Sequence, residues 1–372
     1  MLHIVHFSYV PNTASTNRLL SYLNNIPSHI IVKLYFLMPD SKRSEVECLP
    51  ENIQVIYCWK KYNAKLKIIA PITYRLSLRY VKRQLKKGDV VYVYNIPHYI
   101  NNLFKSGVRY YGERTESPEV TTSPSRLIPF TLKKHLTLCR KLDGIFVIST
   151  ALREYYVSNG VSEDKIHIIN MTVDSIRFCN LSKEKCQHRY IAYCGSFANT
   201  KDGLDKLLRS FAVVSKDIPD IYLYIIGPGS ADEENANSHL VEMLGIQEKV
   251  IFTGPVLAKD MPQLLKNAEV CALARPDTLQ SKCGFPTKLG EYLLTKNPVV
   301  LTDVGDISLF LEDNVSALIS SPDNDDEFAY KLKWVLSNPL QAREVGKKGY
   351  EAALTHFNAK YEVEKLLKYM RL

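Results

Sequence analysis

Residues 284–302 read GFPTKLGEYLLTKNPVVLT and combine a loop, a helix and a strand in that order. Pro286 suits the first turn of a helix, because proline lacks an N–H that would have no partner there. The apolar spacing predicts a helix over 286–295, and the apolar run 298–302 predicts a strand buried on both faces. The same order recurs along the chain, which predicts an α/β protein built on parallel, helix-covered sheets.

This pattern extends through both halves of the 372-residue chain, a length that suits about two domains. In the first half we expect strands at 2–9, 30–37, 52–59, 90–94, 107–111, 144–148 and 166–170. One helix is expected to begin at 19–23, a second to end near residue 87, and two more to span 127–142 and 150–159. The polar stretch 181–189 is the expected linker. In the second half we expect strands at 190–194, 221–226, 250–253, 270–274, 298–302 and 317–319, and helices at 204–217, 236–244, 259–268, 286–295, 307–311, 324–337 and 339–370. Ligands of such sheets bind beyond the carboxyl ends of the strands.

Composition excludes several classes of protein. Hydrophobic residues make up 46% of the chain and charged residues 23%, which excludes a mainly disordered chain. The eight cysteines contain no Cys-x-x-Cys pair, so we expect neither a disulfide scaffold nor a zinc cage. No GxGxxG follows the first strand of either half, which disfavours a dinucleotide-dependent oxidoreductase. Neither a signal peptide nor an apolar run of about 18 residues is present, so we expect a cytoplasmic protein.

Basic residues concentrate in the first half of the chain. Residues 1–180 hold 25 Lys and Arg against 13 Asp and Glu, whereas the remainder holds 23 against 26. Between Glu51 and Asp89 there are ten basic residues and no acidic one. A helix here would separate a basic face from an apolar one, namely Arg75, Arg79, Lys82, Arg83 and Lys86 from Tyr74, Leu78, Val81 and Leu85. The composition of residues 60–87 therefore predicts that they dock on an anionic membrane surface, where each cation adds about 1 kcal/mol of binding free energy. The alternative is an ordinary surface helix, and no nucleic-acid-binding motif accompanies the charge.

Three loops that follow predicted strands contain residues suited to a nucleotide. In 284–292, the N–H groups of residues 284, 285 and 287 would face an anion, and Glu291 would accept hydrogen bonds from two hydroxyls, as of a ribose. In 193–203, Gly195 and Ser196 let a ligand approach the backbone, and Lys201 supplies a positive charge for phosphate. The turns 227–229 and 252–256 would line a crevice for a base. Each loop also has a structural interpretation, as a plain helix start, an ordinary strand-to-helix loop or a tight turn.

Together these motifs follow a recognisable order, namely Gly195-Ser196 with Lys201, Gly227-x-Gly229, 252–254, a helix at 261–268, 285–292, 298–300 and Gly305-Asp306. The order resembles the C-terminal domain of glycosyltransferase family 4, over about residues 185–350. The resemblance implies the GT-B fold, with two Rossmann-like doubly wound domains facing a central cleft. It implies an N-terminal acceptor-binding domain at 1–183, a nucleotide-sugar-binding domain at 184–355, and a helix at 356–372 that returns to the first domain.

The function implied by this resemblance is that of a retaining hexosyltransferase. Such an enzyme uses a nucleoside-diphosphate sugar as co-substrate and requires no cofactor and no metal ion. It would transfer the sugar to a hydroxyl of a glycolipid, oligosaccharide or polysaccharide in cell-surface polysaccharide biosynthesis, peripherally on the cytosolic face of the membrane. Two alternatives are a catalytically inactive, sugar-nucleotide-binding partner subunit and a GT-B sugar-nucleotide epimerase.

The resemblance also assigns roles to matched positions. The family usually shows two glutamates eight residues apart; here the second is Glu291, expected to hold the donor ribose, and the first position is Cys283. Lys201, Arg275 and the backbone of 195–196 would stabilise the negative charge on the leaving diphosphate. The remaining donor-binding positions are Gly227, Val256, Phe285, Pro286, Thr287 and Lys288.

The first half is expected to bind the acceptor. We predict that Glu113 and Arg114 lie in a loop after the strand 107–111 and reach the sugar or an acceptor hydroxyl. The alternative for this pair is a salt bridge in a surface loop. His98 is a second candidate for the acceptor side. In place of the family's glycine-rich first loop, residues 10–18 offer Ser, Thr and Arg side chains.

Overall fold

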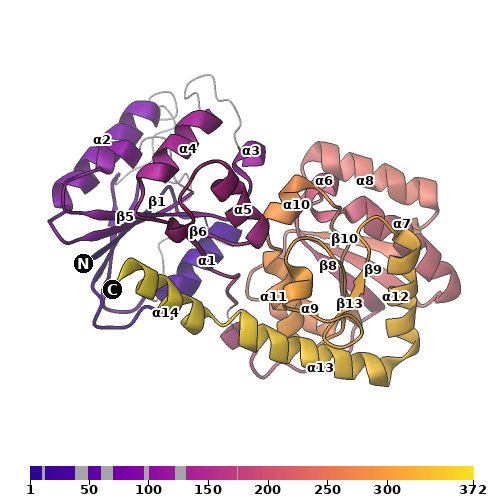
Figure 1. The fold of residues 1–372 in the computed structure, drawn as a ribbon. Helices are drawn as coiled ribbons and strands as arrows, with labels where there is room; N and C mark the ends of the chain where they lie inside the picture. The colour runs from indigo at the N-terminus through magenta and orange to yellow at the C-terminus, as the bar shows by residue number, and fades with distance from the viewer. Residues whose placement is uncertain (11–12, 38–48, 60–69, 96–99, 122–130, 174) are drawn as a thin grey trace. The chain divides into compact units, whose positions relative to one another are not determined.

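The computed structural model describes residues 1–372 apart from 11–12, 38–48, 60–69, 96–99, 122–130 and 174. The chain divides into two compact units: unit 1 is Met1–Asn170 with Ala359–Leu372, and unit 2 is Met171–Asn358. Each unit is a parallel sheet with helices on both faces, which confirms the predicted α/β class (Figure 1). The chain changes unit after residues 170 and 358, whereas we expected boundaries after 183 and 355.

Within the described residues, the sheet of unit 1 has the strand order β3-β2-β1-β4-β5-β6-β7. Its strands are β1 Leu2–His6, β2 Val32–Phe36, β3 Ile53–Tyr57, β4 Val90–Tyr94, β5 Arg109–Arg114, β6 Gly144–Val147 and β7 Ile166–Ile168. β1, β4 and β6 are almost entirely buried, because helices cover both faces of a parallel sheet. The order reverses between β1 and β4, the position at which doubly wound sheets bind ligands.

The helices of unit 1 lie on opposite faces of its sheet. They are α1 Ala14–Leu23, α2 Ala70–Gln84, α3 Pro118–Thr121, α4 Leu132–Lys141, α5 Thr150–Ser158 and α14 Ala359–Met370, with 3-10 turns η2 Ile100–Leu103 and η3 Glu163–Lys165. Figure 1 shows α2 and α4 on one face and α1 and α14 on the other. α14 contributes Val363, Leu366, Leu367 and Met370 to the buried cluster that contains residues of β1, β2 and β4. The end of the chain therefore completes the core of unit 1.

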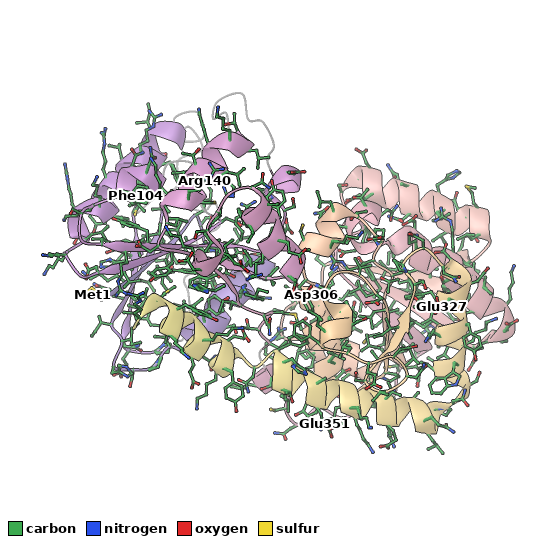
Figure 2. The ribbon with its side chains drawn as sticks, in the orientation of Figure 1. Met1, Phe104, Arg140, Asp306, Glu327 and Glu351 are labelled. Carbon is green, nitrogen blue, oxygen red and sulfur yellow. The ribbon has the colours of Figure 1, made fainter. Side chains whose placement is uncertain are left out.

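Unit 2 repeats the arrangement with the described strand order β10-β9-β8-β11-β12-β13. Its strands are β8 Arg189–Cys194, β9 Ile221–Ile226, β10 Val250–Gly254, β11 Val270–Leu273, β12 Val299–Thr302 and β13 Leu318–Ser320. Its helices are α6 Asn199–Asp202, α7 Leu204–Asp217, α8 Ala231–Leu244, α9 Met261–Asn267, α10 Leu279–Cys283, α11 Thr287–Leu294, α12 Asp325–Ser337 and α13 Pro339–His356, with 3-10 turns η4 Ser175–Phe178, η5 Gln247–Lys249 and η6 Ile307–Leu309. The order reverses between β8 and β11, and side chains fill the space between sheet and helices (Figure 2).

Two helices begin earlier than predicted because of their capping residues. α1 begins at Ala14 rather than within 19–23, since the Thr13 hydroxyl accepts a hydrogen bond from a first-turn N–H. α8 begins at Ala231 rather than at 236, since Ser230 and Glu233 form a capping box. Both caps precede the first apolar residue of the helix, so apolar spacing alone misses them.

The predicted helix 339–370 is in fact two helices, α13 and α14. Phe357, which lies between them, is buried, and its ring centroid lies 5.4 Å from that of Phe285 and 5.2 Å from that of Phe310. The Phe357 carbonyl accepts a hydrogen bond from the N–H of Val173 at 3.1 Å. These contacts end the helix where the chain leaves unit 2 for α14.

Candidate functional site

The strand reversal of unit 2 places three glycine-containing loops side by side at the carboxyl edge of the sheet. The N–H of Gly195, after β8, donates to the carbonyl of Ile226 at 2.8 Å. The N–H of Gly227, after β9, donates to the carbonyl of Gly254, the last residue of β10, at 3.1 Å. A Cβ at Gly227 would overlap the Gly195 carbonyl. The loops form one continuous rim, and tight packing accounts for the glycine at position 227.

A charged pair lies against this rim. Lys288, in the first turn of α11, donates to Asp202 of α6, with Nζ and Oδ2 2.6 Å apart. Asp202 Oδ2 also accepts a hydrogen bond from Ser196 Oγ at 2.9 Å. Burial alone would raise the pKa of the Asp202 carboxyl, but the Lys288 ammonium and these hydrogen bonds bring the pKa below its usual value. The Lys288 side chain is 20% exposed and that of Asp202 is 7% exposed. Burial lowers the pKa of the Lys288 ammonium, although Asp202 partly offsets this.

Gly195 makes room for this ammonium. A Cβ at position 195 would overlap Nζ of Lys288, so any larger residue would displace the lysine from Asp202. Lys288 also lies over the ring of Tyr193, with Nζ 5.1 Å from the ring centroid. The loop after β8 and the start of α11 thus fit each other through the lysine side chain.

Glu291 lies one helical turn beyond Lys288 and has its own partner. Arg177, in η4, donates from Nη1 to Glu291 Oε1 at 2.6 Å and from Nη2 to the carbonyl of Ala258 at 2.9 Å. Both side chains of the pair are partly exposed. Residues three apart on a helix share a face, so α11 presents Lys288 and Glu291 together.

Two other residues of the same motif hold α11 in place. The Tyr292 hydroxyl accepts a hydrogen bond from the N–H of Cys194 at 2.6 Å and donates one to its carbonyl at 3.3 Å. Gly290 lacks a side chain where a Cβ would overlap Val173. The stretch 287–292 therefore combines residues that hold α11 in place with residues that carry a charge.

The Cys194 thiol, at the end of β8, marks the centre of this site. Burial raises the pKa of the thiol to about 12, while Lys288 and Arg177 lower it and Glu291 and Asp202 raise it by smaller amounts. The charges of all four side chains therefore act on one sulfur atom. Arg275, which follows β11, is another charged residue of this site. It is buried and contributes to lowering the pKa of Asp202.

The other predicted donor-site residues lie around this cluster. Lys201 belongs to α6 rather than to a loop, and its carbonyl accepts a hydrogen bond from Arg275 Nε at 3.3 Å. Thr287 is half-buried at the start of α11, and Val256 is half-buried after β10. Pro286 is the residue immediately before α11 rather than in its first turn.

Three positions before α11 serve the fold. The Gly284 N–H donates to the Gln280 carbonyl at 3.1 Å, so the expectation that it faces an anion is wrong. The Phe285 side chain is buried, with ring centroids 5.6 Å from Phe310 and 5.4 Å from Phe357. Cys283, at the position of the family's first glutamate, is also buried.

The predicted acceptor-side residues of unit 1 form a buried network. Glu113 and Arg114 lie in β5, so the prediction that they form a loop is wrong. The strand continues because Glu113 pairs in register with Tyr94 of the neighbouring β4. The Glu113 carboxylate accepts hydrogen bonds from Arg18 Nε and from the hydroxyls of Tyr22 and Tyr92. It is fully buried and contacts no solvent.

Arg18 ties this network to the end of unit 1. It lies in α1 rather than in a loop, and its two terminal nitrogens each donate at 2.8 Å, to the carbonyls of Ile169 and Asn170. Arg114 is buried and donates from Nη1 to the Asn95 carbonyl at 3.3 Å. His98 lies outside the described residues.

Residues 188–338 match the family model of the Glycosyl transferases group 1. This stretch is therefore similar to the group 1 glycosyl transferases. The matched stretch contains Asp202, Lys288 and Glu291, whereas Arg177 lies before it. The whole chain shares its fold with HepE of Anabaena in complex with UDP and glucose, at a TM-score of 0.75 and 14% identity, covering 100% of this chain and 99% of that one. The fold is therefore that of the GT-B glycosyltransferases, as the resemblance implied.

Two further proteins are similar in sequence to part of this chain. An uncharacterized glycosyltransferase of Methanocaldococcus jannaschii is 26% identical over 207 residues, which is 52% of this chain and 51% of that protein. The mannosylfructose-phosphate synthase of Agrobacterium fabrum is 24% identical over 159 residues, which is 38% of this chain and 35% of that protein. The chain thus spans about half the length of the first of these relatives and about a third of the second.

Of the helices in the described ranges, none combines the length and the hydropathy that a bilayer span requires. Within the same ranges, no group of three or more His, Cys, Asp and Glu side chains is arranged to hold a metal ion.

Proposed function

We propose that this protein transfers a sugar from a nucleoside-diphosphate sugar to a hydroxyl of a glycolipid or polysaccharide. The observation that supports this most directly is the charge arrangement at the carboxyl end of β8, where α11 presents Lys288 and Glu291 on one face. The stretch that matches the group 1 glycosyl transferases contains both residues, and HepE, which shares the fold, was solved with UDP and glucose. A sugar nucleotide has a diphosphate for the ammonium and a ribose for the carboxylate.

The proposed chemistry places cations where negative charge develops. When the bond between the anomeric carbon and the diphosphate breaks, the electron pair leaves with the diphosphate. Lys288, Lys201 and Arg275 would stabilise that charge, and fixed charges of this kind are usually the largest contribution to such a reaction. We propose that these side chains act in place of a metal ion and that the product retains the anomeric configuration, as the family resemblance implies.

Glu291 is proposed to bind the ribose while its ion pair with Arg177 stays intact. A carboxylate offers about four lone-pair positions, so it can accept two ribose hydroxyls while it remains paired with the guanidinium. Arg177 would then orient the carboxylate, and it is a positioning residue rather than a ligand of the donor.

Unit 1 is proposed to bind the acceptor at the carboxyl edge of its sheet. Glu113 is fully buried and paired with Arg18, so the geometry favours a role for it in holding the sheet together rather than in touching the acceptor. The cell-surface acceptor and a peripheral location on the cytosolic face of the membrane are part of the same proposal, supported by the basic excess between Glu51 and Asp89.

A donor-binding subunit without activity is the second candidate, favoured by the buried Cys283 at the position of a family glutamate. One experiment separates the two. The purified full chain is melted with UDP-sugars and GDP-sugars, because a ligand at 100 times its Kd adds about 2.7 kcal/mol of stability. Mass spectrometry then detects donor hydrolysis and transfer to a panel of glycolipid and oligosaccharide acceptors.

We expect one nucleotide class to raise the melting temperature and to be consumed. A melting temperature unchanged by every sugar nucleotide would overturn the donor site itself. Binding without hydrolysis or transfer over the whole panel would establish the inactive subunit instead.

Lys201→Ala provides a finer test of the proposed chemistry. The substitution should lower turnover more than it lowers affinity for the free nucleoside diphosphate, because the charge that the lysine meets is largest as the diphosphate leaves. Lys282→Ala is the matched control, since this exposed lysine pairs with Asp277 on the surface. Turnover equal to wild type in the Lys201 variant would remove this residue from the reaction.

A further inference from the structure

Helix α2 has a second apolar surface that the sequence pattern does not reveal. Its predicted apolar face is confirmed: Tyr74, Leu78, Val81 and Leu85 are buried in unit 1. On the opposite side, Ile72 is 58% exposed, Leu76 is 45% exposed and Tyr80 is 43% exposed. These three follow one another at intervals of four residues, so they form a continuous stripe along the helix. We call them the exposed stripe.

A row of cations runs beside the exposed stripe. Arg75, Arg79 and Arg83 repeat at the same interval of four residues, and all three are exposed. Each lies about one helical turn from a residue of the exposed stripe. The helix contains no acidic residue, and neither does the chain between Glu51 and Asp89. The helix ends at Gln84, earlier than the expected Lys87, and the Asp89 carboxylate is turned back to accept the N–H of Lys86 at 2.7 Å. The outward face of α2 is therefore apolar and positively charged at once.

The apolar surface continues onto the sheet. Phe7 directly follows β1, is 56% exposed, and has its ring centroid 5.8 Å from that of Tyr74 in α2. This contact joins the helix to the carboxyl edge of β1, the edge at which a doubly wound sheet binds its ligand. Figure 1 shows α2 lying over one face of that sheet, and side chains project outward from it in Figure 2.

We propose that the outward face of α2, with Phe7, docks unit 1 on an anionic lipid bilayer, the stripe inserting among the lipids and the arginines meeting their headgroups. Charge complementarity identifies the occupant, because a helix that carries three exposed arginines and no acidic residue of its own matches a surface of phosphate groups. An apolar stripe alone would fit a second copy of the chain, but the like charges beside it would then face each other across a two-fold interface. The inference rests on the proposed membrane location and specifies its contact, and it does not depend on transferase activity.

The test is co-sedimentation of the full chain with vesicles. One vesicle is phosphatidylcholine alone, and the other contains equal parts of phosphatidylcholine and phosphatidylglycerol. Ile72→Ser with Leu76→Ser removes the stripe and keeps the charges, whereas Arg79→Gln with Arg83→Gln removes charges and keeps the stripe. Leu340→Ser and the pair Arg343→Gln with Lys348→Gln make the same chemical changes at exposed positions of α13 in unit 2. All substituted side chains are exposed, and unchanged melting temperatures verify the folds.

We expect the wild-type chain to sediment with the anionic vesicles and not with the neutral ones. The arginine pair should weaken binding by about fivefold for each charge removed, and the stripe pair by about tenfold, whereas the α13 controls should bind like wild type. Equal binding by both α2 variants and wild type would overturn the proposal, as would equal binding to the two vesicles. A dimer that the stripe pair alone converts to a monomer, without vesicle binding, would assign the stripe to a second copy instead.

Loss of vesicle binding and loss of the proposed function are distinguishable. The α2 variants should bind nucleotide and use a water-soluble acceptor like wild type, because the donor site lies in unit 2. A wild-type chain that sediments but transfers nothing would contradict the proposed function and leave the docking surface in place.

Discussion

The two units share a strand order and use the same position in it differently. In unit 1, Arg18 and Glu113 meet beside the reversal between β1 and β4, with side chains 4% and 0% exposed. In unit 2, Lys288 and Asp202 meet beside the reversal between β8 and β11, with side chains 20% and 7% exposed. One pair is enclosed by tyrosines and backbone carbonyls, while the other stands at an open rim of glycine loops.

This difference separates two uses of buried charge. Topology determines where a doubly wound sheet can bind a ligand, but burial determines whether the charges there are available to it. The enclosed pair of unit 1 links α1, β5 and the segment that leads out of the unit. The open pair of unit 2 holds an ammonium in a fixed position beside the glycine loops. The following experiments test whether the distinction holds.

The largest effect is expected from Arg18→Met. The substitution leaves the Glu113 carboxylate buried without a cation, which typically costs about 3–5 kcal/mol. Urea unfolding measures the loss in the transition of unit 1. Arg153→Met is the matched control, because its pair with Glu163 is on the surface and should be worth at most about 1 kcal/mol. Similar losses in the two variants would contradict the contrast between an enclosed pair and a surface pair.

Glu291→Ala should have the next largest effect, on binding rather than on stability. Two charge-assisted hydrogen bonds to a ribose are worth about 3 kcal/mol together, or roughly a hundredfold in the Kd for a nucleoside diphosphate. Titration calorimetry with UDP and GDP measures the change. Glu269→Ala is the control, because this carboxylate pairs with Lys183 away from α11. An unchanged Kd for whichever nucleotide binds would exclude the ribose role.

Lys288→Met should weaken binding of the same nucleotide by about tenfold, the typical value of one charge-assisted contact. This change should cost less stability than the loss of Arg18, because Ser196 still donates to Asp202 and Arg275 remains as a cation near that carboxylate. Calorimetry and urea unfolding of the same preparation give both numbers. A large loss of stability with unchanged affinity would make the open pair of unit 2 structural, like the enclosed pair of unit 1.

The smallest effect is a pH dependence confined to unit 1. Desolvation lowers the pKa of His3 and of His6 below the ordinary 6.5, although Asp89 partly offsets this for His3. A lowered pKa favours the neutral ring in the folded state, so its stabilising contribution is complete above pH 6.5 and is lost as the pH falls through the folded pKa. Asp202 has a lowered carboxyl pKa, so the pair in unit 2 persists until the pH falls below the 3.8 of an ordinary aspartate. Hydrogen exchange should therefore show loss of protection in β1 before β8, and simultaneous loss would contradict the assignment.

Local pattern was enough to predict most of the sheet. The strands 90–94 and 221–226 and the helix 204–217 match the structure at both ends, because their apolar runs are bounded by turn residues. The motif 284–292 likewise identified α11, and its resemblance to glycosyltransferase family 4 indicated the fold. What local pattern missed were capping residues and the exposed stripe of α2, whose spacing is the same as that of a buried face.

Contacts between residues that are distant in sequence could not be predicted from local pattern. Lys288 and Asp202 are separated by 86 positions, and Arg18 and Glu113 by 95, so no local pattern connects them. Asp202 does stand next to Lys201, and an acidic residue in a phosphate loop is a usable signal that a second cation will be needed there. Arg177 had no such signal, since it lies outside every motif and its partner Glu291 is 114 positions away.

The position of α14 has a consequence for how the chain is made. Val363, Leu366, Leu367 and Met370 are synthesised after all of unit 2, yet they belong to the core of unit 1. Although Met1–Asn170 is synthesised before unit 2, unit 1 lacks part of its hydrophobic core until α14 has followed. Unit 2 contains all of its own strands and helices within Met171–Asn358 and has no such delay. The part that is synthesised second is the first that can finish folding, the reverse of the usual order for successive domains.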